Sequence, residues 1–264
     1  MSAEDAARHT IFDLPETARK ARQSPRLGIA MTDVCALCLQ NATLCNSHIV
    51  PEFCYQSIYD EKHRMIAFSP NNSQNRKFEQ KGLRSYLLCA DCESLISTKL
   101  ESPFKEFWVD GKQLEGLISS RPLLLRNIDY QMFKLFHLSV LWRASVTYNA
   151  AFNEVSLGNH AEIIRRMLLA GDPGPEQRYP IFCRALIKSD GSPCSELFMS
   201  PRRFKLGSHH GYTLTYCGCE WGFIISSHRC TEVERRCLSE NGTLPIANEA
   251  VESLFKRIQR QVGY

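Results

Sequence analysis

The chain has 264 residues, of which 44% are hydrophobic and 23% are charged, and its formal net charge is +4. This composition is ordinary for a soluble protein with a sizeable core, and so small a charge does not by itself indicate a nucleic-acid-binding protein. The sequence has no apolar run long enough to cross a bilayer and no secretory signal pattern after Met1, so we expect a cytoplasmic protein without a membrane partner.

The first segment, residues 1–30, mixes alanine, arginine and serine with two prolines and shows no sustained apolar period. We expect a mobile tail there. The next segment, residues 31–108, contains two Cys-x-x-Cys pairs and is predicted to be a metal-bound module. The remaining residues, 109–264, are expected to form a larger domain.

The two cysteine pairs are Cys35-Ala-Leu-Cys38 and Cys89-Ala-Asp-Cys92. Two residues between cysteines let the backbone turn so that both thiolates face one ion, and two such pairs complete a tetrahedral site for structural Zn²⁺. Four ordinary buried cysteines would not explain the paired spacing. Cys45 and Cys54 lack a partner at this spacing and are interpreted as small core residues, with Cys45 the better alternative ligand because it precedes His48 by three residues.

The segments between and after the pairs have the pattern of a small zinc fold. A strand over 42–50 carries His48 and is stopped by Pro51, and a strand over 84–89 leads into the second pair. A helix over 91–101 would begin at that pair, where its free N–H groups and dipole stabilise thiolates. The order of knuckle, hairpin, knuckle and helix is the outline of a treble clef.

Basic residues are concentrated in the loop between Glu61 and Tyr86, which contains six basic and two acidic residues. The loop could contact a phosphate backbone, or it could be a solvated loop that happens to be basic. The basic residues are Lys62, Arg64, Arg76, Lys77, Lys81 and Arg84.

The segment 109–264 has the pattern of a mixed helical and antiparallel β domain. Asp129 is predicted to cap a long helix, apolar around most of its circumference, and His137 and Arg143 on it are interpreted as satisfied core or boundary residues. A second helix ends at Gly171. The other expected elements are strands over 180–187, 196–199, 212–217 and 221–225, a turn around 218–220, and a helix over 248–261.

Two further features of this segment have no settled role. A basic stretch at 201–205 could contact nucleic acid or be an exposed turn. A group of histidines and cysteines could chelate a second metal or fill a β-rich core, and it lacks the Cys-x-x-Cys spacing. Its members are His209, His210, Cys217, Cys219, His228, Cys230 and Cys237.

Cys-x-x-Cys, then Ser47-His-Ile-Val-Pro51 followed by an aromatic residue, then Cys-x-x-Cys-Glu together resemble a divergent group of HNH, or ββα-metal, endonucleases built on a zinc-bound treble clef. Residues 31–101 carry this resemblance. The stretch 138–145 also resembles one that accompanies Ser-His-Ile-Ile-Pro proteins of bacteria. The implied fold class is α+β, a ββα-metal zinc module followed by the mixed domain.

The resemblance implies that the chain hydrolyses phosphodiester bonds in nucleic acid, DNA in the first instance. It implies that His48 is the general base and that Mg²⁺ or Mn²⁺ stabilises the leaving oxygen. The alternative for His48 is a structural role, as a zinc ligand or hydrogen-bonded beside the zinc. Glu93 falls at the position of a ligand for that ion, and His63 could supply another ligand or contact phosphate. Ser47 departs from the family, which has an aspartate or histidine there, and the family's asparagine is not evident before the second cysteine pair.

Two other interpretations remain open from the sequence. The zinc module could have lost catalysis and bind nucleic acid or protein through its basic loop. Alternatively, the zinc is purely structural and the function belongs to residues 103–264, as a partner of another protein.

Overall fold

The computed structural model describes residues 32–67, 77–79, 82–118, 123–226 and 234–262. The fold is mixed α+β, as predicted, and nearly all its strand pairs are antiparallel. The expected tail over 1–30 lies outside the described residues, as do Arg76, Lys81, His228 and Cys230. Within the described part of the chain, no helix is long and apolar enough to cross a membrane.

The N-terminal sheet has the order β1-β2-β5. Strand β2 (Asn41–His48) pairs with β1 (Thr32–Val34) on one side and with β5 (Arg84–Cys89) on the other, both antiparallel. A register shift between Cys45 and Asn46 lets His48 lie opposite Arg84. A short 3₁₀ helix, η1 (Glu52–Tyr55), follows Pro51, and β3 (Met65–Ala67) pairs with β4 (Lys77–Glu79) in a separate ribbon.

The helix expected over 91–101 belongs to a longer helical run that does not stop at Pro103. It comprises α2 (Ala90–Ile96), the π-helical η2 (Ser97–Glu101), α3 (Ser102–Phe104) and the π-helical η3 (Lys105–Asp110). A proline inside an α-helix clashes with the carbonyl four residues earlier. The wider π turn just before Pro103 relieves that clash, so the run continues to Asp110, and α4 (Gln113–Ile118) follows.

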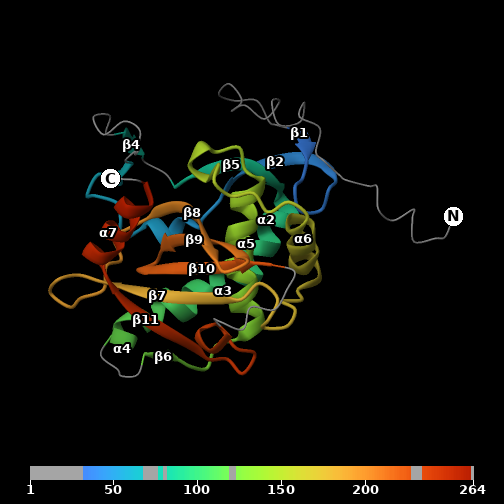
Figure 1. The fold of residues 1–264 in the computed structure, drawn as a ribbon. Coiled ribbons are helices and arrows are strands. Elements are labelled where there is room, and N and C mark those ends of the chain that lie inside the picture. Colours follow the sequence, from blue (N-terminus) through green and yellow to red (C-terminus); the bar gives the residue numbers. More distant parts are fainter. Residues whose placement is uncertain (1–31, 68–76, 80–81, 119–122, 227–233, 263–264) are drawn as a thin grey trace.

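The predicted long helix is α5 (Tyr130–Val146), and it lies at the centre of the molecule, with the six-stranded sheet on one side and β2 and β5 across one end (Figure 1). The Asp129 carboxylate accepts the backbone N–H of Met132 at 3.0 Å, which caps the helix as expected. Every side chain from Phe133 to Ala144 is buried. The rings of Phe136 and Phe104 stack with centroids 3.7 Å apart, which joins α5 to the helical run.

His137 is a core residue, as predicted, but only one of its ring nitrogens is satisfied. Its Nδ1 lies 2.6 Å from the Tyr216 hydroxyl, whereas Nε2 is buried and has no hydrogen-bond partner. The ring packs against Trp221 with centroids 4.1 Å apart. Complete burial lowers the pKa of His137 well below its ordinary value, so the ring is neutral at neutral pH.

Lys134 in α5 is 1% exposed, and its Nζ donates to the Tyr130 hydroxyl at 2.9 Å and to the Pro175 carbonyl at 2.7 Å. Burial lowers the pKa of Lys134 from 10.5 to about 7, against the opposing effect of Glu240 and Glu176. Between these two pH values the unfolded chain binds more protons than the folded chain. This residue's contribution to the free energy of unfolding therefore rises with pH through that window.

We predict that Lys134→Met removes this rise, which is at most about 4 to 5 kcal/mol. Urea unfolding at intervals from pH 7 to 10.5, the window set by the folded and ordinary pKa values, measures the effect. Lys99→Met, at an exposed position, is the matched control and should change the free energy of unfolding by less than about 0.5 kcal/mol at pH 7. Parallel stability curves for the Lys134→Met and natural chains would contradict the prediction.

The larger sheet has the order β6-β11-β7-β10-β9-β8. Only the pairing of β11 with β7 is parallel among the described strands. The second predicted helix, α6, packs against α5 and ends at Gly171, whose φ of +65° forms the expected left-handed cap. The bounds are β6 (Leu124–Leu125), η4 (Ala150–Phe152), α6 (His160–Ala170), β7 (Ile181–Ile187), β8 (Met199–Leu206), β9 (His209–Tyr216), β10 (Cys219–Ile225), η5 (Glu234–Arg236), β11 (Leu244–Ala250) and α7 (Val251–Val262).

Three sequence expectations for this sheet were wrong in detail. The strand expected over 196–199 begins only at Met199 and runs through the basic stretch 201–205, which is therefore not a turn. Pro201 is tolerated because β8 is an edge strand with a register shift beside that residue. The hairpin turn lies at residues 217–218, one residue earlier than expected, and residues 248–250 belong to β11 rather than to the last helix.

One hydrophobic cluster runs from Cys35 through α5 to Ile246. The boundary predicted near residue 108 therefore does not interrupt the core, because Phe104 and Trp108 pack directly on α5. The segment that contains the cysteine pairs therefore shares its hydrophobic core with the central helix α5.

Candidate metal centre and active site

The two cysteine pairs meet at one point in the structure. The Sγ atoms of Cys35, Cys38, Cys89 and Cys92 all lie within 4.8 Å of one another, and those of Cys38 and Cys89 are 3.9 Å apart. Four sulfurs at about 2.3 Å from a tetrahedral ion would be about 3.8 Å from each other. This four-cysteine cluster could therefore hold a metal ion, and the donor set suits zinc.

The local backbone favours a thiolate at Cys35. Burial alone would raise the pKa of the Cys35 thiol, but backbone N–H groups of Cys38, Cys89 and Leu37 point at the sulfur and lower the pKa to about 7. Burial raises the pKa of the Cys92 thiol, and the neighbouring thiols add to that effect. Four deprotonated sulfurs in this space would repel one another, and a divalent cation is what removes the repulsion.

Cys45 and Cys54 do not belong to the four-cysteine cluster. Cys45 is half-buried on β2, where burial and the nearby Glu93 raise the pKa of its thiol. Cys54 is 1% exposed in η1 and is a core residue, as predicted.

His48 is the last residue of β2, and its side chain is 20% exposed. Its Nε2 lies 2.5 Å from Oε2 of Glu52 and 2.9 Å from Nε of Arg84. Burial, and secondarily the positive charge of Arg84, lower the pKa of His48, whereas Glu52 acts in the opposite direction. The net lowering keeps the imidazole neutral at neutral pH, as a general base requires.

Glu52 lies at the centre of a group of donors. Its Oε1 accepts the Tyr59 hydroxyl at 2.8 Å, and its Oε2 accepts the Gly82 N–H at 3.3 Å. Burial alone would raise the pKa of Glu52, but the Tyr59 hydrogen bond and His48 lower it, so the carboxylate is ionised. We name His48, Glu52, Tyr59 and Arg84 the His48 cluster.

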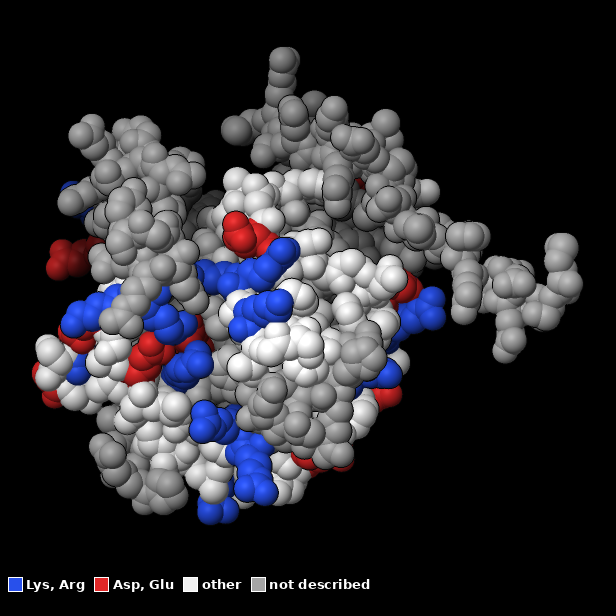
Figure 2. Space-filling view, in the orientation of Figure 1, with Lys and Arg blue, Asp and Glu red and all other residues white. Residues whose placement is uncertain are grey.

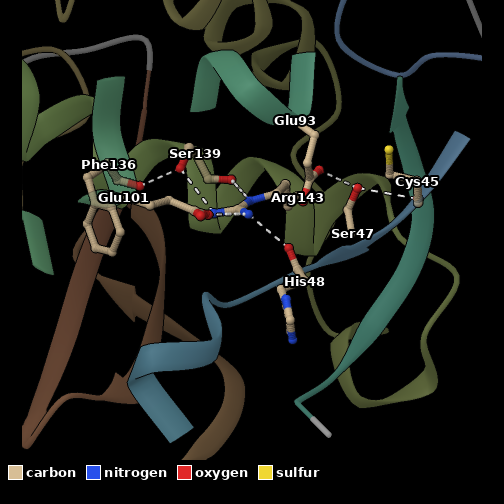
Figure 3. A network of polar contacts seen from close by, with 8 residues as sticks. All are labelled: Cys45, Ser47, His48, Glu93, Glu101, Phe136, Ser139 and Arg143. Carbon is tan, nitrogen blue, oxygen red and sulfur yellow. Dashed lines mark hydrogen bonds and ion pairs between the residues drawn. The ribbon is translucent and has the colours of Figure 1, made fainter. Parts of the chain in front are cut away.

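The side chain of Ser47 points to the opposite face of β2 from that of His48, because successive side chains of a strand alternate. Glu93 of α2 lies on the Ser47 side. Ser47 is 1% exposed, and its hydroxyl donates to Oε2 of Glu93 at 2.5 Å. Figure 3 shows the imidazole of His48 pointing away from Glu93 and Ser47. The structure thus places Glu93 beside Ser47 and does not bring it to the imidazole of His48.

Arg143 of α5 anchors the backbone of His48. Its Nη1 donates to the His48 carbonyl at 2.8 Å and to Oε1 of Glu101 at 2.7 Å, and its Nε donates to the Ser139 carbonyl at 3.3 Å (Figure 3). The side chain is 1% exposed. Arg143 is therefore a satisfied core residue, as predicted, and it also fixes the end of the strand that carries His48.

No model of a known protein family, no curated protein and no solved structure matches this chain. The functional inference therefore depends on the geometry of the site.

One further predicted residue, His63, lies against the His48 cluster. The ring of His63 packs on Tyr59 with centroids 4.0 Å apart, and its Nε2 is 3.7 Å from Oε1 of Glu52, although 64% of the side chain is exposed. Arg64 donates to Asp60 at 2.7 Å, so part of the loop's positive charge is neutralised locally. Lys62 is exposed, and Lys77 lies on β4.

The later histidines and cysteines do not gather into a second metal site within the described residues. His209, which lies 2.9 Å from the Ser226 hydroxyl, and Cys217 flank opposite ends of β9. Cys217, Cys219 and Cys237 are buried, which is the expected alternative of cysteines in a β-rich core.

Sequence reasoning missed Glu52 and Tyr59, and it assigned Arg84 to the basic loop without its contact to His48. A weak signal for Glu52 was present, because Pro51 marks a turn that can bring a carboxylate back to a histidine four residues earlier. The contact between Arg84 and His48 depends on the register between β2 and β5. That register shifts between Cys45 and Asn46, and no sequence pattern predicts the shift.

Proposed function

We propose that this chain is an HNH-like endonuclease that hydrolyses phosphodiester bonds in nucleic acid, with DNA as the expected substrate. The observation that carries the proposal is a neutral, partly exposed imidazole, His48, at the end of β2, a strand that pairs with Cys89 of the four-cysteine cluster at Leu44. The proposed ion in that cluster is structural Zn²⁺. Its role is to hold β2, β5 and α2 together so that His48 keeps its position.

In this proposal His48 removes a proton from the attacking water. In the same proposal Arg84, whose guanidinium is adjacent to the imidazole, binds a phosphate oxygen of the substrate. A divalent ion such as Mg²⁺ or Mn²⁺ would stabilise charge on the leaving oxygen. Glu93, the carboxylate expected to hold it, lies on the other face of β2 from the imidazole, so an ion beside His48 would depend on water and on the substrate phosphate for its ligands.

The surface supports contact with a polyanion. Figure 2 shows lysine and arginine side chains in a broken run down the middle of the displayed face. Arg203 and Lys205 on the edge strand β8 are exposed. Basic side chains of this kind bind a phosphate backbone without regard to sequence.

We predict that the purified chain nicks supercoiled plasmid with Mg²⁺ or Mn²⁺ and that His48→Ala lowers the rate by on the order of 10² to 10⁴, the usual contribution of a general base. His210→Ala, at an exposed position on β9, is the matched control. Zinc content should be equal in all three proteins. Nicking that persists in His48→Ala would refute the assignment, and a parallel assay on RNA would show the substrate class.

A second candidate is a zinc module that binds nucleic acid without cleaving it. The observation that favours it is the hydrogen bond between Ser47 and Glu93, which uses the carboxylate proposed for the metal and lies away from the His48 imidazole. If this candidate is right, we expect salt-sensitive binding of nucleic acid through the loop around Lys62 and Arg84, and no cleavage of the nucleic acid with any divalent metal.

A further inference from the structure

The Nε2 atom of His48 contacts one hydrogen-bond acceptor and one hydrogen-bond donor, which require opposite protonation states of that nitrogen. The Glu52 carboxylate, 2.5 Å away, is only an acceptor and requires a proton on Nε2. The Arg84 Nε–H, 2.9 Å away, is only a donor and requires a bare nitrogen. A neutral imidazole satisfies one of them, and that choice decides which ring nitrogen is free to act as a base.

The contacts favour Glu52. A carboxylate facing a bare ring nitrogen at 2.5 Å would bring two lone pairs together, so this shorter contact requires a hydrogen between the atoms. Arg84 has another partner for its charge, because its Nη2 is 3.9 Å from Oε2 of the same carboxylate. The Arg84 guanidinium can therefore pair with Glu52 or with a substrate phosphate, and it does not need the His48 imidazole as a hydrogen-bond acceptor.

Glu52 is itself held in place. Tyr59 donates to one carboxylate oxygen, and the Gly82 N–H donates to the other. A Cβ at position 82 would lie 3.1 Å from Oε2 of Glu52 and 2.5 Å from the Tyr55 ring, so the backbone approaches this closely only because residue 82 is glycine. Ile49 and Val50, between His48 and Glu52, are fully buried and fix the intervening chain.

Building on the proposed function, we propose that Glu52 is a positioning residue that holds the proton of His48 on Nε2 and thereby leaves Nδ1 as the basic atom. Among the described residues none is hydrogen-bonded to Nδ1, and the side chain is partly exposed, so water can reach the ring. The arrangement follows the general logic of a carboxylate that fixes the tautomer of a catalytic histidine.

The test measures the tautomer directly and does not require activity. Long-range ¹⁵N–¹H NMR of the imidazoles, with His48 assigned by comparison with His48→Gln, should show the Nε2–H form in the natural chain above the pKa of His48. Glu52→Gln should lose that preference, because its amide can donate to Nε2. Glu61→Gln, an exposed acid in the same loop, is the matched control and should leave the spectrum unchanged.

The charged groups around the ring also set the direction of its pKa change. They are Glu52, Arg84 and, at longer range, Glu101. Removing the Glu52 charge should lower the pKa of His48 further, because that carboxylate favours the protonated ring. The nicking rate of Glu52→Gln should fall on the order of 10²- to 10⁴-fold, and Glu52→Asp should recover part of it.

An Nδ1–H tautomer in the natural chain would overturn the proposal, since Arg84 would then be the donor to Nε2. An unchanged tautomer in Glu52→Gln would overturn it as well. Failure of the proposed function is distinguishable, because a chain that never nicks but shows a Glu52-dependent Nε2–H tautomer keeps the positioning role and loses only the nuclease.

Discussion

Replacing Cys89 with serine should abolish binding of the proposed zinc at the four-cysteine cluster and unfold the sheet β1-β2-β5 together with α2. Cys89 joins β5 to α2, and its N–H also donates to the Cys35 sulfur at 3.3 Å. Binding of a structural zinc contributes about 10 to 16 kcal/mol in small zinc domains. That is comparable to the whole stability of a typical domain, about 5 to 15 kcal/mol, so we do not expect the hydrophobic core around α5 to compensate for its loss.

Elemental analysis should find one zinc per chain in the natural protein and none in Cys89→Ser, and hydrogen exchange should report lost protection in β2 and β5. Cys45→Ser is the matched control, because Cys45 lies on the neighbouring strand β2, opposite Leu88, and outside the four-cysteine cluster. It should retain zinc. Full zinc content in Cys89→Ser, or loss of zinc in Cys45→Ser, would show that the ligand set is different.

Replacing Arg143 with methionine should lower the free energy of unfolding by about 3 to 5 kcal/mol. Most of this loss of unfolding free energy comes from the partners of Arg143 that would remain without a hydrogen-bond or ion-pair partner. Glu101, whose side chain is 18% exposed, loses its ion-pair partner, and the His48 carbonyl loses its donor. Removing one member of a buried pair leaves the other charge without compensation.

Urea unfolding measures the Arg143→Met effect, and the double variant with Glu101→Gln should recover part of the loss because both charges are then gone. Arg166→Met is the matched surface control, since Arg166 also pairs with a glutamate but is 76% exposed. That variant should cost less than about 1 kcal/mol. A cost below about 1 kcal/mol for Arg143→Met would mean that the buried network does not stabilise the fold.

The features that depend on local pattern were predictable from the sequence. The spacing of Cys35, Cys38, Cys89 and Cys92 indicated their convergence, because two-residue spacing constrains the backbone wherever the rest of the chain goes. The central helix was predictable because an Asp cap precedes seventeen residues that are apolar on nearly all sides.

The features that depend on tertiary pairing were not predictable. Whether Pro103 ends a helix depends on the π turn before it, which the residues do not specify. Whether residues 201–205 form a turn or an edge strand depends on the partner β9. Likewise, the contact between Arg84 and His48 exists only because a register shift in β2 brings them opposite each other.

The position of β11 constrains how the chain can acquire its structure during synthesis. This strand, residues Leu244–Ala250, lies between β6 and β7, so the sheet against which α5 packs has a gap until residue 250 has left the ribosome. Until then β7 presents a free edge. Such late, long-range pairing makes folding slow and leaves the nascent chain open to aggregation, so its yield in cells should depend on chaperones.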